Sequence, residues 1–230
     1  MLLIALPIFA IFFLFAGGSR SVRHLQNVSV VEIDLGPDVE IRPIVVKGSA
    51  DGESFSQIIE RLHPYAAING TYFDSKMRPL GDIVINGKLV NRGCYRNAMG
   101  VTSRGKVAFL HKSSGRLDWS GFKAGIAAGP RLVHGGRIAL NPVADGFSRR
   151  SLEIQAWRSG VGLTKTGKLI LVTAKESITL ARFAQIMLDL GAVDALNLDG
   201  GGACGLYQDG RMLAMPALRL SNILAVFKHR

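Results

Sequence analysis

The sequence predicts a single α+β domain built on a mostly antiparallel or mixed sheet with a few packed helices. Many short apolar runs alternate with Gly-containing turns, and glycine accounts for 27 of the 230 residues; this pattern is typical of sheets with short connections. Only two stretches carry the apolar spacing of an amphipathic helix, and they lie far apart in the chain. A chain of this length can bury one sizeable core, so we expect one domain over residues 20–230.

The first residues have the composition of a targeting segment. Residues 1–16 are almost continuously apolar, and small residues follow up to Ser19. This run is shorter than the ~20 residues that a spanning helix needs, and it resembles the apolar region of a secretory signal. No Lys or Arg precedes it, whereas Arg20 and Arg23 follow it, which is unusual for a cleaved signal. We expect residues 1–19 to be a signal peptide or an N-terminal membrane anchor. The expected location is therefore periplasmic, extracellular or membrane-attached; a buried core helix is the alternative.

The first elements of the domain are two strands and a helix. Residues 28–35 and 39–46 are apolar runs on either side of a Gly-Pro-Asp turn, which predicts a hairpin. A helix is expected after Ser54, because Ser54 and Gln57 can form a capping box. It should end at His63, which precedes a proline.

A short buried strand over residues 66–68 runs into Asn69-Gly70, a turn signal. It brings Asn69, Thr71 and Asp74 to a strand end, where binding residues concentrate. A hairpin turn without function explains the same residues equally well.

The middle of the chain consists of strands and turns. Residues 82–90 predict a hairpin around an Asn-Gly turn of the I′ type, and residues 98–110 repeat the pattern. Residues 125–133 form a buried strand interrupted by Gly129-Pro130. Residues 141–151 are expected to be an exposed loop that could cover a pocket.

The last third predicts a hairpin over residues 158–173, the clearest helix of the chain, and further strands. Ser177 is the expected helix cap and Gly191 its stop. The helix leads into the strand 194–199, and residues 222–227 form a final strand.

The strand at residue 194 ends in a polar, glycine-rich segment. Period-2 alternation directs Leu196 and Leu198 to the core and projects Asn197 and Asp199 from the opposite face. The glycines 200–202 allow a ligand close to the main chain, and their N–H groups can form an anion-binding concavity. These groups suit a phosphorylated or sugar-like ligand. A tight turn in which Asp199 accepts N–H groups of the loop is the alternative.

Charge and cysteine content restrict the partners. The net charge of +11 favours anionic partners. The Lys and Arg residues are scattered without aromatic interleaving, which argues against nucleic acid. Cys94 and Cys204 show no metal-ligand spacing; they form one disulfide or two free thiols. No cofactor is predicted, although Asp199 could join a site for a divalent cation. The sequence does not indicate an oligomeric state.

Five short motifs occur in an order and spacing that resemble one known family. They are Asn69-Gly-Thr-Tyr-Phe73, Ala128-Gly-Pro-Arg-Leu132, Arg158-Ser-Gly-Val-Gly162, Ala195-Leu-Asn-Leu-Asp-Gly-Gly-Gly202 and Ser221-Asn-Ile-Leu-Ala-Val-Phe227. The family is that of the phosphodiester glycosidases, and the similarity covers about residues 60–227. It implies an α+β domain that hydrolyses a sugar joined through its anomeric carbon to a phosphodiester. The family usually has Ser or Thr after the glycine run, where this chain has Ala203 and Cys204.

The resemblance and the chemistry together assign candidate roles. Arg158 would compensate the phosphate charge, and Asp199 would act at the anomeric centre as nucleophile, base or electrostatic stabiliser. The candidate catalytic residues are Asp199, Arg158 and Asn69. The candidate substrate-binding residues are Asn197, Gly200, Gly201, Gly202, Thr71 and Cys204.

Two further functions remain open from the sequence. A Cys204 thiol after a glycine turn could be a nucleophile, although none of the five histidines lies in a partner motif. A non-catalytic envelope module that binds or helps assemble an anionic polysaccharide is the alternative outside enzymes.

Overall fold

The computed structural model describes residues 22–25, 27–46 and 51–229. The expected signal peptide or anchor, residues 1–19, lies outside these ranges. Within them, no helix is both long enough and apolar enough to cross a membrane.

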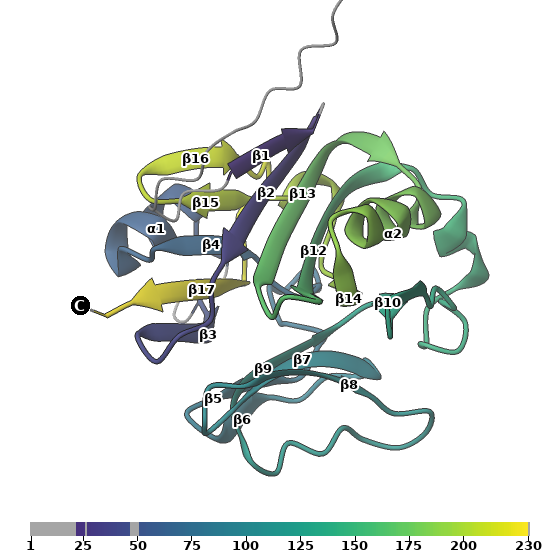
Figure 1. Cartoon of the computed structure of the whole chain (residues 1–230), viewed down its shortest axis with the longest axis horizontal. Helices are drawn as coiled ribbons and strands as arrows, with labels where there is room; N and C mark the ends of the chain where they lie inside the picture. Colours follow the sequence, from purple (N-terminus) through teal and green to yellow (C-terminus); the bar gives the residue numbers. More distant parts are fainter. Residues whose placement is uncertain (1–21, 26, 47–50, 230) are drawn as a thin grey trace, which may run out of the picture.

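The strands form three antiparallel sheets (Figure 1). In spatial order, the seven-stranded sheet contains β1 (Val22–Leu25), β2 (Val28–Ile33), β13 (Leu169–Ile178), β12 (Ala156–Thr164), β14 (Ala192–Asn197), β10 (Arg131–His134) and β11 (Arg137–Ile138). The second sheet contains β16 (Arg211–Ala214), β15 (Leu206–Gln208), β4 (Ala66–Asn69), β17 (Asn222–Lys228) and β3 (Val39–Val45). The third contains β6 (Lys88–Asn91), β5 (Ile83–Ile85), β9 (Phe122–Ala128), β7 (Asn97–Thr102) and β8 (Val107–His111).

Two α-helices accompany the sheets in the described part of the chain, α1 (Phe55–Leu62) and α2 (Leu180–Asp189). In Figure 1, α1 lies beside the second sheet and α2 beside the seven-stranded sheet. Two short 3₁₀ turns, η1 (Arg149–Leu152) and η2 (Gly201–Ala203), occur in loops. The fold is therefore a single domain of mostly antiparallel sheet.

Alternating side chains divide the interior into connected apolar layers. Along β2, Val31 and Ile33 join a core to which all three sheets contribute, whereas Val28 and Val30 face the layer under α2. A third cluster packs α1 against the second sheet. The central core thus lies where the three sheets face one another.

One expected pairing is wrong, whereas one expected interruption of a strand is confirmed. The predicted hairpin of residues 28–46 does not form, because β2 pairs with β1 and β13 while β3 pairs with β17. The strand over residues 125–133 is interrupted at Gly129-Pro130 as expected, and the structure adds that its two parts, β9 and β10, belong to different sheets. In both places the turn signal is real, but the chain after it moves to another sheet.

Both helices begin at caps, one of which the sequence identifies. At α1, Ser54 and Gln57 form the expected capping box. At α2 the cap is Thr179, which accepts a hydrogen bond from Arg182 N at 3.2 Å, and not Ser177. Strand β13 continues to Ile178, so Ser177 still belongs to the sheet.

The glycines of the Arg158-Ser-Gly-Val-Gly162 motif allow α2 to approach β12. A Cβ on Gly160 would lie 2.9 Å from Phe183 Cε1 of α2 and 3.0 Å from Leu196 O. Gly160 pairs with Asn197 of β14. This close packing fixes the position of β14, whose end carries the polar segment.

Candidate functional site

The polar residues gather where the three sheets meet. Strand β4 ends at Asn69, β14 ends at Asn197, and the crossover at Gly129-Pro130 leads from β9 to β10. The start of β12 lies beside the end of β14, because Leu198 N donates to Ser159 O at 2.8 Å. Strand β14 ends at Asn197, which pairs with Gly160 of β12, so continuing this antiparallel register by two residues brings Arg158 and Asp199 to the same end of the two strands. The structure therefore brings Asp199, Arg158 and Asn69 to one place.

Asn69 uses its amide to fix the glycine-rich segment. Its Nδ2 donates to Asp199 O at 2.8 Å, and its Oδ1 accepts from Gly205 N at 3.1 Å. Asp199 N also donates to Gly70 O at 3.1 Å. Asn69 is 1% exposed, so its side chain holds both ends of the segment and is not available to a ligand.

The Asp199 carboxylate is partly buried and has one neutral partner. Gly200 N donates to Oδ1 at 2.8 Å, and Oδ2 accepts no hydrogen bond from the described residues. Within the described part of the chain it forms no ion pair with Arg158. Burial raises the pKa of Asp199 to about 6, and the Gly200 hydrogen bond opposes this shift. Asp199 is therefore a carboxylate that titrates near neutral pH and keeps one oxygen free.

Main-chain carbonyls hold the Arg158 guanidinium. Nε donates to Ile178 O at 3.1 Å and Nη2 donates to Ile154 O, while Nη1 donates to no group among the described residues. The residue is 7% exposed, and burial lowers the pKa of Arg158 from its usual value. An arginine stays protonated nonetheless, so the site contains an oriented positive charge with one unused nitrogen.

A hydrogen-bond chain connects Asn197 to the crossover. Asn197 Nδ2 donates to the Tyr72 hydroxyl at 2.7 Å, and Tyr72 donates to Gly129 O at 2.8 Å. Burial, with the nearby Asp199 charge, raises the pKa of Tyr72 well above its usual range. Asn197 is fully buried and also donates to Leu198 O at 2.6 Å. It therefore positions Tyr72 and the end of β14.

Two further aromatic rings pack against Tyr72 of this hydrogen-bond chain. Tyr95 and Phe147 stack with centroids 4.9 Å apart, and both contact Tyr72 in tilted geometry. Burial, with smaller effects of Cys94 and Asp199, also raises the pKa of Tyr95 above its usual value. Sequence reasoning missed these rings. Tyr72 belongs to the motif of residues 69–73, and Phe147 belongs to the loop that was expected to cover a pocket. Nothing in the sequence indicated that the two rings are in contact.

The glycine run turns sharply after Asp199. Gly201 has φ +60°, and a Cβ on Gly200 would lie 2.8 Å from Trp157 O. Gly200 N is used by Asp199, whereas the N–H groups of Gly201 and Gly202 donate to no group in the described chain. Gly201 and Gly202 border a pocket of about 340 Å³ that also contacts Trp157.

Two more of the expected site residues, Thr71 and Cys204, are buried away from solvent. Thr71 is 1% exposed, and its hydroxyl lies toward Gly81, where a Cβ would approach it to 2.6 Å. Cys204 is 1% exposed, and burial raises its pKa to about 12. Cys94 and Cys204 are both free thiols. The thiol of Cys204 is thus protonated at neutral pH, which argues against the nucleophile hypothesis.

The other candidate carboxylate, Asp74, is engaged elsewhere. It forms an ion pair with Arg78 at 2.6 Å on an exposed loop. Glu153 is exposed beyond η1. The described residues contain no group of three or more His, Cys, Asp or Glu side chains that could hold a metal ion.

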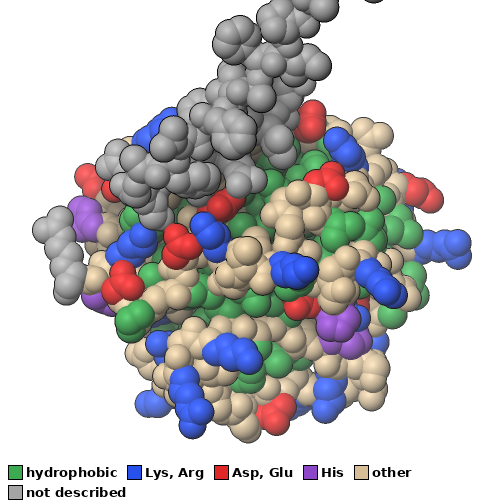
Figure 2. All heavy atoms as spheres, in the orientation of Figure 1, with side chains coloured by type: hydrophobic (Ala, Val, Ile, Leu, Met, Phe, Trp, Pro, Cys, Tyr) green, Lys and Arg blue, Asp and Glu red, His purple; other side chains and the backbone are tan. Residues whose placement is uncertain are grey.

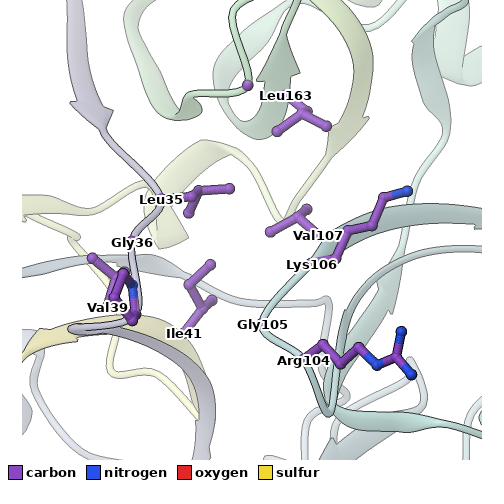
Figure 3. Close-up of a pocket in the computed structure, with 11 residues that line it drawn as sticks. Leu35, Gly36, Val39, Ile41, Arg104, Gly105, Lys106, Val107 and Leu163 are labelled. Carbon is purple, nitrogen blue, oxygen red and sulfur yellow. The ribbon is translucent and has the colours of Figure 1, made fainter.

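A larger hollow of about 530 Å³ lies apart from this site. In Figure 3, Leu35, Ile41, Val107 and Leu163 surround it, and the basic side chains of Arg104 and Lys106 lie along one side. It shares no lining residue with the Asp199 cluster. Figure 2 shows basic and acidic side chains interspersed on the visible face, without one large basic patch.

Three of the solved structures with a similar fold are described here. The catalytic domain of zebrafish N-acetylglucosamine-1-phosphodiester alpha-N-acetylglucosaminidase has a TM-score of 0.71 and 23% identity, covering 88% of this chain and 77% of that one. A Synechocystis protein has a TM-score of 0.66 and 20% identity; the match covers 88% of this chain and 59% of that one. A Burkholderia pseudomallei protein has a TM-score of 0.66 and 14% identity, with 87% and 73% covered. At these identities the likeness concerns the fold.

Sequence comparisons supply the family. A comparison with curated proteins found no significant match. A family model described as phosphodiester glycosidase matches residues 63–227, which include Asn69, Arg158 and Asp199. This stretch is most of the chain, and it agrees with the resemblance carried by the five motifs. The protein belongs to the phosphodiester glycosidase family.

Proposed function

We propose that the protein hydrolyses the bond between the anomeric carbon of a sugar and the oxygen of a phosphodiester. Family membership supports this reaction class. The observation that carries the proposal is that Arg158 on β12 and Asp199, just past the end of β14, lie at the same end of these paired strands, with no ion pair joining them among the described residues. The negative charge of Asp199 and the positive charge of Arg158 are thus both available to a ligand.

The reaction separates charge in a way that these two residues match. Breaking the bond leaves its electron pair on the phosphate oxygen and creates oxocarbenium character on the sugar. Water then supplies a hydroxyl group to the anomeric carbon, and its remaining proton is released. Phosphate is a good leaving group, so the reaction depends mainly on compensating both developing charges.

Arg158 is placed to bind the departing phosphate. Its guanidinium is fixed by the carbonyls of Ile154 and Ile178, and Nη1 remains for a phosphate oxygen. The free N–H groups of Gly201 and Gly202 support the same charge. Because the guanidinium is already oriented, little side-chain entropy is lost on binding.

Asp199 is placed to act at the anomeric centre through Oδ2. It is a nucleophile, a base or an electrostatic stabiliser, and all three roles need its ionised form. Asn69 and Asn197 act as positioning residues, since Asn69 holds the Asp199 main chain and Asn197 holds Tyr72.

The test is an assay of the purified protein on a panel of sugar-1-phosphodiesters, with and without chelator. We expect released sugar with at least one member and a loss of at least about 100-fold in kcat for Asp199→Asn. The matched control is Asp189→Asn, which alters an exposed aspartate that accepts a hydrogen bond from Gln185 of the same helix. It should keep wild-type turnover.

The outcomes separate the proposals. Equal turnover of Asp199→Asn and wild type would refute the role of Asp199. Tight binding of an anionic polysaccharide without any released sugar would favour the non-catalytic envelope module instead.

We further propose that the substrate is a phosphorylated glycan met outside the cytoplasm. The apolar residues 1–16 support export or membrane attachment. Cell fractionation with N-terminal sequencing tests this: a cytoplasmic chain that retains its first residues would contradict it.

A further inference from the structure

Exposed apolar side chains collect around the glycine-rich turn. Three large ones are well exposed, namely Trp157 at 38%, Met215 at 53% and Leu218 at 53%. Leu218 N donates to Gly202 O at 3.0 Å, and Trp157 O lies against Gly200. Large exposed apolar patches mark binding surfaces in soluble proteins.

The pocket of about 340 Å³ opens within this patch. Its lining includes Trp157, Met215, Ala217 and the two glycines 201 and 202, and none of its lining residues is charged. This is notable in a chain of net charge +11. The volume falls in the range of small-molecule sites, about 300–1,000 Å³.

The pocket adjoins the groups proposed to bind phosphate. Trp157 directly precedes Arg158 on β12, and the lining residue Ser177 directly precedes Ile178, whose carbonyl accepts from Arg158 Nε. Gly201 follows the Asp199-Gly200 pair. Because Gly201 and Gly202 line the pocket and their N–H groups donate to no group among the described residues, a phosphate bound by these N–H groups would border the apolar pocket.

We propose that this pocket is the subsite for the alcohol of the phosphodiester, and that the protein selects substrates whose alcohol begins with an aliphatic chain. The inference rests on the proposed function. With the anomeric carbon at Asp199 and the phosphate at Arg158, the second phosphate ester points into the pocket. A charged or sugar-like alcohol gains nothing from walls of Trp, Met and Ala, whereas an aliphatic chain removes that surface from water.

The first experiment measures binding of the expected product, an alkyl phosphate, by calorimetry. Hexyl phosphate should bind at least about 10-fold more tightly than methyl phosphate, since the added methylenes lose contact with water. Met215→Ser should remove most of this preference and Met215→Leu should restore it. The matched control is Val90→Ser, which alters an apolar side chain of similar exposure (47%) on β6.

The second experiment compares hydrolysis of methyl and hexyl diesters of one sugar 1-phosphate. We expect a higher kcat/KM for the hexyl ester than for the methyl ester, and a loss of that preference in Met215→Ser. Equal binding of the two alkyl phosphates, or equal effects of Met215→Ser and Val90→Ser, would overturn the subsite. Retained preference for hexyl phosphate without hydrolysis of either ester would uphold the pocket and contradict the proposed reaction.

Discussion

Burial determines the acidity of Asp199, and with it the pH at which the proposed reaction runs. A carboxyl in water has a pKa of about 3.9, whereas desolvation raises the pKa of Asp199 to about 6. No cation neutralises it among the described residues, so the shift persists. The ionised form therefore predominates only above about pH 6.

We expect kcat/KM to fall about tenfold per pH unit below pH 6 and to level above it. The sign follows from the ionised form being required, because protonation below the pKa removes the charge. The phosphodiester stays anionic over this pH range, so the substrate adds no further pH dependence to kcat/KM. Rate measurements from pH 4 to 8 check this; a limb near pH 4, or activity that falls above pH 6, would contradict an ionised Asp199.

The two cysteines should differ in reactivity. Burial raises the pKa of Cys204 to about 12, and only the thiolate reacts with iodoacetamide. Cys94 is exposed. Mass spectrometry of the native protein should show carbamidomethylation at Cys94 alone, and both sites should react in denaturant. Modification of Cys204 in the native protein, with loss of activity, would support the hypothesis that Cys204 is the nucleophile.

At the scale of elements, the start of α2 can be tested directly. Thr179 caps the helix by accepting from Arg182 N, so Thr179→Ala should lower the free energy of unfolding by about 1 kcal/mol. Ser177→Ala is the matched control, because Ser177 is exposed and lies in β13. Urea unfolding of both variants measures the difference. A larger loss for Ser177→Ala would mean that the helix begins earlier.

Local chemistry made several elements predictable. The capping box of α1 forms as expected, and the Asn86-Gly87 turn has φ values of 51° and 73°, the positive values of a I′ turn. The sequence also predicted the hairpin of β12 and β13 and the alternation of buried and polar side chains along β14. Each of these depends on residues close together in the chain.

Pairing between distant strands was not predictable in the same way. The turn at Gly36-Pro37-Asp38 gives no indication that β3 pairs with β17, almost two hundred residues later. Nor does the sequence show that β9 and β10 separate into different sheets. Long-range packing decides these pairings.

The candidate site was predictable in part for the same reason. The motifs identified Asp199, Arg158 and Asn69, and alternation predicted the buried Leu196 and Leu198. The use of the Asn69 amide, the burial of Thr71, and the aromatic group around Tyr72 depend on how three sheets meet. Those contacts exist only after the chain has folded.

At the scale of the whole molecule, the central core links the three sheets. Ile33 comes from the seven-stranded sheet, Ile68 from the second and Ile126 from the third, and all belong to one cluster. The site at the junction depends on this linkage, because its residues come from β4, β12, β14 and the crossover between β9 and β10. Separation of any sheet would remove part of the site.

The two tryptophans allow this linkage to be measured, since they belong to different sheets. Trp157 lies in β12, whereas Trp119 packs against Gly125 of β9 and donates to Asp82 Oδ2 at 2.9 Å. With either one replaced by Phe, the fluorescence of the other should follow the same urea transition as far-UV circular dichroism, as in a two-state unfolding. Comparison within each variant removes any effect of the substitution on stability. A Trp119 transition at lower urea than the circular dichroism would show that the third sheet unfolds separately, and Tyr95 and Gly129 would then leave the site before Asp199 does.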